Sequence, residues 1–211
     1  MGKSQEERGN YWNSYYTAKA VPDIPSQFAA FALSECRSAD FFLDVGCGNG
    51  RDSFFFARHD MPVVSVDAST AAIEDIAERA NAGNLPISAL SSACDDPSLM
   101  GKVTDALAKL KVSGVGVIYA RFFIHAITDK EQAGFLDFCA AFLKKNGGKL
   151  ALEFRTAADE NLSKVTAAHY RRYVEPVDFL EELFKRDLTA SYSRKALVMR
   201  NTKTMMPLLF G

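Results

Sequence analysis

The chain has 211 residues, a formal net charge of −1, and 48% hydrophobic and 24% charged residues. Its length suits one α/β domain with a full core and is short for two, and its balanced charge gives no global basic field for nucleic acid or an anionic membrane. No apolar run approaches the roughly 20 residues of a membrane helix, and the scattered cysteines and histidines have no zinc-binding spacing. We therefore expect a cytoplasmic protein that has no metal and no nucleic-acid or membrane partner.

Residues 1–37 are expected to form an aromatic arm and a helix. The arm, residues 10–16, contains the only tryptophan and three of the seven tyrosines. It could fold over a ligand as a lid, or pack against the edge of a sheet or against a second subunit in a homodimer. Residues 26–37 predict a helix with Ser26 as its N-cap.

Residues 41–52, FFLDVGCGNGRD, combine an apolar run, an aspartate and three alternating glycines. This pattern predicts a buried strand, a tight turn and then a helix over 53–58. Because glycine has no Cβ, the backbone N–H and carbonyl groups of the turn can approach a ligand closely. We expect the turn to hold a nucleoside-bearing cofactor.

Strands and helices alternate along the rest of the chain. Strands are predicted at 63–66, 87–90, 115–119 and 149–154, and helices at 70–80, 99–111, 129–145 and 176–185. Thr128 and Glu131 are spaced as a capping box for the third of these helices. Two final strands are expected at 188–192 and 203–210. The alternation indicates a doubly wound, mostly parallel sheet, whose ligands bind at the carboxyl ends of the strands.

The glycine spacing distinguishes two classes of cofactor. The GxGxxG fingerprint of dinucleotide-binding proteins needs a third glycine where this chain has Arg51. The string Asp44-x-Gly46-x-Gly48-x-Gly50 instead resembles motif I of the class I S-adenosylmethionine-dependent methyltransferases, and the order of elements resembles that family over residues 38–185. The resemblance implies a Rossmann-like methyltransferase fold with three α/β/α layers and a seven-stranded sheet over residues 38–211. It also implies S-adenosylmethionine as the cofactor and S-adenosylhomocysteine as the product.

The resemblance also assigns roles to single residues. Asp67, at the end of the second strand, would accept hydrogen bonds from the ribose hydroxyls, and Asp44 would orient the loop or meet the cofactor ammonium. Either carboxylate could instead only cap neighbouring backbone. Many family members hold the adenine with an acid after the third strand. Ala93 stands there in this chain, so backbone groups or Asp95 would take that role. The expected cofactor-binding residues are Asp44, Gly46, Cys47, Gly48, Asn49, Gly50, Arg51, Asp67, Ala68, Ala93, Cys94, Ala120 and Arg121.

Arginines gather near the ends of the fourth and fifth strands, and arginine suits bidentate binding of carboxylate or phosphate. We expect Arg121, Arg155 and one of Arg171 and Arg172 to form an anion pocket. The expected substrate-binding residues are Arg155, His169, Tyr170 and Arg171, and the acceptor would be a small anion such as a phosphate- or carboxylate-bearing sugar or metabolite. The alternatives are that Arg171 and its neighbour Arg172 lie on a solvated helix face and that Arg155 pairs with a nearby acid. Arg51 could reach the cofactor carboxylate or the substrate, or form a surface ion pair.

Methyl transfer to an O or N nucleophile needs in-line geometry and sometimes a general base. The expected catalytic residues are His125, as the base, with Arg121 and Glu153. His125 stands in the apolar context Phe122–Ile127, where a packing role is the alternative. The strings YARFFIHAI, EFRT and PSQFA are similar to bacterial methyltransferases associated with surface-polysaccharide biosynthesis.

The sequence pattern also bears on three other functions. Arg51 argues against an NAD(P) oxidoreductase. A protein that binds S-adenosylmethionine without catalysis, or as a regulator, has the same motif I. An NPPY-type tetrapeptide after the fourth strand would resemble the amino-group DNA and RNA methyltransferases. Residues 119–122 of this chain read YARF instead, which argues against methylation of nucleic acid.

Overall fold

The computed structural model describes residues 5–17, 23–160, 170–193, 196–198 and 203–210. Its centre is an eight-stranded sheet in the order β3-β2-β1-β4-β5-β8-β6, with β7 also paired to β8. Five neighbouring strands run parallel, namely β1 (Phe41–Val45), β2 (Val63–Asp67), β3 (Ile87–Ser91), β4 (Gly116–Arg121) and β5 (Gly148–Arg155). The predicted α/β fold with a parallel sheet is therefore confirmed.

The other end of the sheet is antiparallel. β8 (Lys203–Phe210) runs antiparallel to β5, and β6 (Ala190–Ser193) and β7 (Ala196–Val198) pair with successive parts of β8. β6 and β7 together fill one position of the sheet. The described strands therefore number eight where seven were expected, because the short strand β7 follows the predicted strand at 188–192.

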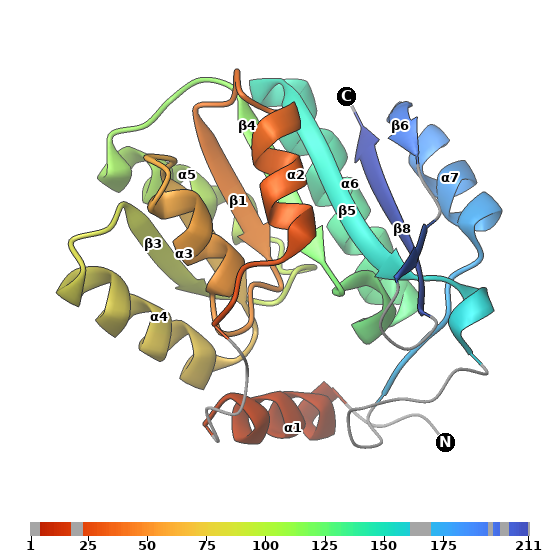
Figure 1. Ribbon diagram of the computed structural model, residues 1–211, viewed down its shortest axis with the longest axis horizontal. Coiled ribbons are helices and arrows are strands. Elements are labelled where there is room, and N and C mark those ends of the chain that lie inside the picture. Colours follow the sequence, from red (N-terminus) through yellow and green to blue (C-terminus); the bar gives the residue numbers. More distant parts are fainter. Residues whose placement is uncertain (1–4, 18–22, 161–169, 194–195, 199–202, 211) are drawn as a thin grey trace.

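Helices cover both faces of the sheet (Figure 1). One face is covered by α2 (Gln27–Glu35), α3 (Arg51–Ala57) and α4 (Thr70–Ala82), and the other by α5 (Leu99–Leu110), α6 (Asp129–Asn146) and α7 (Pro176–Phe184). β1 is buried along its whole length, as expected for a central parallel strand. Its alternating side chains enter different cores, since Phe41 packs with α6 and Phe42 with α2 and α3.

The predicted N-caps Ser26 and Thr128 are confirmed. The Ser26 hydroxyl accepts a hydrogen bond from the Ala29 N–H at 2.9 Å, and Thr128 and Glu131 form both bonds of a capping box. Most bounds differ from prediction by one or two residues, and two of these differences affect the edge where ligands are expected. α3 begins at Arg51, directly after the left-handed Gly50, and β4 extends to Arg121, which brings that side chain to the end of its strand.

The aromatic arm is part of a helix, α1 (Gln5–Thr17). Figure 1 shows α1 beside the carboxyl ends of the parallel strands, where the arrowheads of β1 and β4 point. Two short 3-10 turns, η1 (Ile124–Ala126) and η2 (Ala157–Asp159), follow β4 and β5 at the same edge. Within the described ranges, no helix has the length and apolar character needed to cross a membrane.

Candidate functional site

A cavity of about 390 Å³ lies at the carboxyl edge of the parallel strands. Its walls come from α1, from the loops after the first four strands, and from the segments that hold Arg155 and Arg171. The predicted site residues that line it are Asp44, Gly46, Cys47, Gly48, Asn49, Arg51, Asp67, Ala68, Ala93, Cys94, Arg121, His125, Arg155 and Arg171. Residues from distant parts of the sequence thus meet where the parallel topology predicts.

Some predicted residues do not form part of this wall. Gly50 lies behind the loop, where a Cβ would come 2.8 Å from Ile76 of α4. Ala120 is buried in the core on the α5 and α6 face, because side chains alternate along β4. Glu153 pairs with Arg121 and Tyr170 lies outside the lining. His169 lies outside the described residues.

The glycine loop between β1 and α3 uses its backbone N–H groups inside the protein. The amides of Gly46 and Cys47 donate to the Val66 carbonyl at 2.8 and 3.2 Å, and the Gly48 amide donates to Asp67 Oδ2 at 2.9 Å. The loop glycines have φ values of +72°, +56° and +74°, which favour glycine. We expected these amides to approach a ligand. They instead brace the loop, which suits a cofactor without a pyrophosphate better than a dinucleotide.

Asp67 joins the glycine loop to α4. Its Oδ2 accepts the Gly48 N–H, and its Oδ1 accepts the Ser69 N–H at 2.8 Å. Burial raises the pKa of Asp67, while these N–H donors oppose the rise. Each carboxylate oxygen retains a second lone pair, so Asp67 can accept further hydrogen bonds from hydroxyl groups in the cavity that it lines.

Asp44 is a buried carboxyl at the wall of the cavity, 3% exposed. Its Oδ2 accepts a hydrogen bond of 2.6 Å from the Ser53 hydroxyl, which itself accepts from Ser65 at 2.9 Å. Burial raises the pKa of Asp44 to about 8, although the Ser53 hydrogen bond favours the charged form. A cationic group in the cavity would therefore stabilise the ionised carboxylate.

Asp52 links three elements, a role that the sequence did not reveal. Its Oδ2 accepts from the Tyr119 hydroxyl at 2.8 Å and the Ser26 hydroxyl at 2.9 Å, and its Oδ1 accepts the Ser26 N–H at 2.7 Å. The Arg51 Nε lies 3.9 Å from Asp52 Oδ1, so Arg51 pairs with a buried acid at the cavity wall. A tyrosine inside the apolar strand β4 is the sequence signal for such a buried partner.

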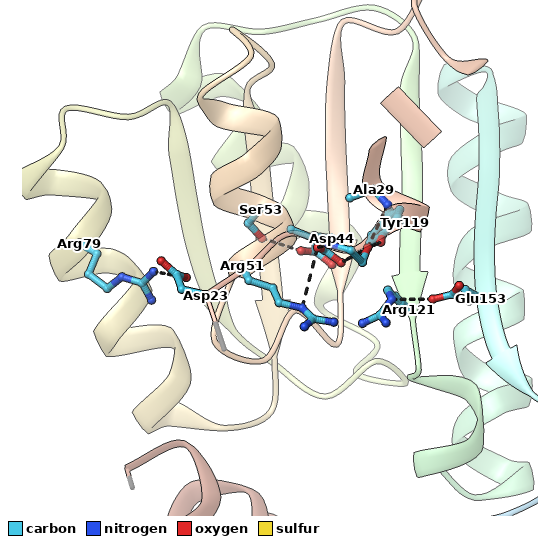
Figure 2. A network of polar contacts seen from close by, with 11 residues as sticks. Asp23, Ala29, Asp44, Arg51, Ser53, Arg79, Tyr119, Arg121 and Glu153 are labelled. Carbon is cyan, nitrogen blue, oxygen red and sulfur yellow. Dashed lines mark hydrogen bonds and ion pairs between the residues drawn. The ribbon is translucent and has the colours of Figure 1, made fainter. Parts of the chain in front are cut away.

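Arg121 and Glu153 form an ion pair of 2.5 Å between Nε and Oε2 at the ends of β4 and β5 (Figure 2). They are direct neighbours in the strand register. Burial raises the pKa of Glu153, and Arg121 opposes the rise. The Arg121 guanidinium lies 4.1 Å from the ring centre of Phe122, which has a φ of +55°. Such a conformation is strained for a bulky residue and is typical of functional sites.

Arg155 is 9% exposed and lines the cavity. Within the described part of the chain, its Nη1 is buried without a hydrogen-bond partner. Burial, and then the nearby Arg171, lower the pKa of Arg155. Its backbone N–H donates to His125 Nδ1 at 3.4 Å, which links the two predicted functional residues.

Arg172 differs from Arg171, although the sequence alone did not separate them. The Arg172 guanidinium binds Asp129, Gln132 and the Ile124 carbonyl, and its backbone N–H donates to the His125 carbonyl at 2.8 Å. Arg172 thus fastens its segment to η1 and α6. Arg171 is the member of the pair that lines the cavity.

Three aromatic side chains of α1 line the cavity, namely Trp12, Tyr15 and Tyr16. The Tyr16 hydroxyl lies 2.5 Å from the position that a Cβ on Gly48 would take, so the ring covers the loop where glycine leaves space. Burial, and then Asp67, raise the pKa of Tyr16. The Ser69 hydroxyl donates to Asn13 Oδ1 at 2.7 Å and holds α1 against α4. Closure of α1 as a lid stays a prediction.

A family model described as a methyltransferase domain matches residues 43–149. No curated protein matches the chain.

Several solved structures share the fold. The 1,6-didemethyltoxoflavin-N1-methyltransferase of Burkholderia thailandensis, solved with 1,6-didemethyltoxoflavin and S-adenosylhomocysteine, is 16% identical with a TM-score of 0.68, covering 96% of this chain and 85% of that one. The CcbJ methyltransferase of Streptomyces caelestis is 15% identical with a TM-score of 0.69, covering 96% of both chains. The cyclase SpnF is 11% identical with a TM-score of 0.69, covering 100% and 96%.

Proposed function

This chain belongs to the methyltransferase domain family and is an S-adenosylmethionine-dependent methyltransferase, and we propose that it methylates an O or N nucleophile of a small anionic molecule. The acceptor class that we favour is a sugar or metabolite with a phosphate or carboxylate group. The Burkholderia relative, whose bound ligand is a small molecule, is compatible with a small acceptor.

The residues of the cavity fit S-adenosylmethionine. The braced glycine loop offers backbone surface without Cβ atoms, and Asp67 retains acceptor capacity for ribose hydroxyls. Asp44 would face the cofactor ammonium, and the segment from Ala93 to Asp95 would border the adenine. When bound, S-adenosylmethionine supplies a methyl group made electrophilic by a positively charged sulfur.

The observation that carries the acceptor class is the buried, unpartnered Nη1 of Arg155. A buried guanidinium nitrogen without a partner is unfavourable, so a carboxylate or phosphate oxygen placed in the cavity would gain a charge-assisted hydrogen bond there. Arg171 lines the same cavity and would add positive charge there. We therefore propose that Arg155 and Arg171 bind the anionic group.

The remaining residues of this region would orient the acceptor. His125 Nδ1 accepts the Arg155 N–H, so the proton of a neutral ring is placed on Nε2. His125 lines the same cavity as Arg155 and would lie beside the acceptor. A role as the general base, which the sequence predicted, needs the contact at Nδ1 to break or the Nε2 proton to move first.

The acceptor class is tested by measuring S-adenosylhomocysteine formation with sugar phosphates, sugar acids and the neutral parent sugars. We expect turnover only with anionic members, and an increase of about tenfold or more in the acceptor KM of Arg155→Ala. The exposed residue Arg58 provides a control, since Arg58→Ala should change neither the KM for the acceptor nor the KM for S-adenosylmethionine. Equal turnover of the neutral sugars, or an unchanged acceptor KM in Arg155→Ala, would contradict the proposal.

A further inference from the structure

Arg79 lies on α4 outside the cavity wall and contacts three separate parts of the chain. Its Nη1 donates to the Asn49 carbonyl of the glycine loop at 3.0 Å and to Asp75 at 3.0 Å. Its Nη2 donates to Asp23 at 2.9 Å, and its guanidinium lies 4.1 Å from the ring centre of Phe54 (Figure 2). With 31% of its side chain exposed, Arg79 is held by partners on several sides.

The contact with Asn49 acts on the cofactor loop. Asn49 lines the cavity, whereas its carbonyl is bound to Arg79 on α4. The neighbouring residue Gly48 donates its amide to Asp67, the proposed ribose acceptor. Arg79 therefore holds the loop from outside the cavity, at the residue that follows Gly48.

The contact with Asp23 acts on the N-terminal segment. Asp23 precedes α2, and Ser26 at the start of that helix is bound to the buried Asp52. At the other end of α4, Ser69 holds Asn13 of α1. The N-terminal end of α4 therefore binds α1 through Ser69, and its C-terminal end binds Asp23 through Arg79. Arg79 also binds the glycine loop.

We propose that Arg79 is a positioning residue for S-adenosylmethionine, acting through the Asn49 carbonyl and Asp23. The planar guanidinium binds the Asn49 carbonyl oxygen through Nη1 and the Asp23 carboxylate through Nη2 at the same time. A lysine has a single ammonium group and is less suited to bind both. Loss of the side chain would let the glycine loop and the segment before α2 move independently. The proposal rests on the proposed cofactor site and is independent of the acceptor.

The experiment compares cofactor binding by Arg79→Ala, Arg79→Lys and Arg58→Ala. Arg58 is a matched control, because its guanidinium also lies over the Phe54 ring, at 5.6 Å, but it is exposed and is not bound to the Asn49 carbonyl or Asp23. Calorimetry with S-adenosylhomocysteine should show about tenfold weaker binding for Arg79→Ala, or about 1.4 kcal/mol. Arg79→Lys should recover part of this loss, and Arg58→Ala should match the unmodified protein.

Thermal unfolding without ligand separates positioning from stability. If Arg79 only stabilised the fold, Arg79→Ala would lower the Tm while the folded variant kept the unmodified Kd, and the proposal would be overturned. Equal Kd values for Arg79→Ala and Arg58→Ala would overturn it as well. Failure of the unmodified protein to bind S-adenosylhomocysteine would instead overturn the cofactor site itself, and with it the role of Arg79.

Discussion

Asp44 shows how one buried side chain can couple cofactor binding to pH. Burial raises its pKa to about 8, far above the ordinary value of about 4. Between these values the folded chain holds a proton that the unfolded chain has lost, so the contribution of Asp44 to stability falls as pH rises toward 8. A bound ammonium would favour the ionised form, and binding would then release the proton.

We predict that the affinity for S-adenosylhomocysteine increases between pH 6 and 7.5, by at most about tenfold per pH unit. Asp44→Asn cannot release this proton, so its Kd for S-adenosylhomocysteine should be higher than that of the unmodified protein at pH 7.5 and nearly independent of pH. Calorimetry in two buffers of different ionisation enthalpy would measure the proton release directly. The same pH profile in both proteins would show that Asp44 does not titrate on binding.

At the level of elements, the Asp52 carboxylate connects α2, α3 and β4. Asp52→Ala would leave the buried N–H of Ser26 without its acceptor, and the hydroxyls of Ser26 and Tyr119, 3.1 Å apart, would keep only each other as partners in this network. Since each unsatisfied buried group costs about 1–3 kcal/mol, we expect the free energy of unfolding to fall by about 3 kcal/mol. Urea denaturation measures this change, with the exposed residue Asp105 as a control in Asp105→Ala. Equal stability of the two variants would show that the network is not needed.

The packing of α1 over the cavity can be followed by fluorescence. Trp12 is the only tryptophan of the chain, lines the cavity and stacks on Tyr16 with ring centres 5.8 Å apart. We expect saturating S-adenosylhomocysteine to change the intensity or wavelength of tryptophan emission. Emission typical of a fully solvated indole, unaffected by the ligand, would show that α1 does not cover the site in solution.

The sequence predicted elements better than it predicted contacts. Periodicity and caps located the parallel strands and most helices, and the strand ends located Asp67 and Arg121. Partners distant in sequence were not predicted, because no local pattern records them. Asp52 meets Ser26 and Tyr119 only after α2 packs on the sheet, and Arg172 differs from Arg171 only through its contacts with α6.

At the level of the whole molecule, the carboxyl edge of the parallel strands brings together the proposed cofactor and acceptor residues. The parallel strands supply the glycine loop, Asp67 and the arginines, while α1 supplies the aromatic wall. Helices on both faces leave this edge as the place where loops from all five parallel strands meet.

The order of the strands also has a consequence for how the chain acquires its shape during synthesis. β8 follows β6 and β7 in the sequence, yet it lies between β5 and β6 in the sheet. A nascent chain that has emerged only as far as β6 lacks the strand with which β6 pairs, so the edge of β5 stays open until residues 203–210 arrive. Open strand edges can pair with other chains, so a partly made molecule that lacks residues 203–210 exposes an edge that favours aggregation.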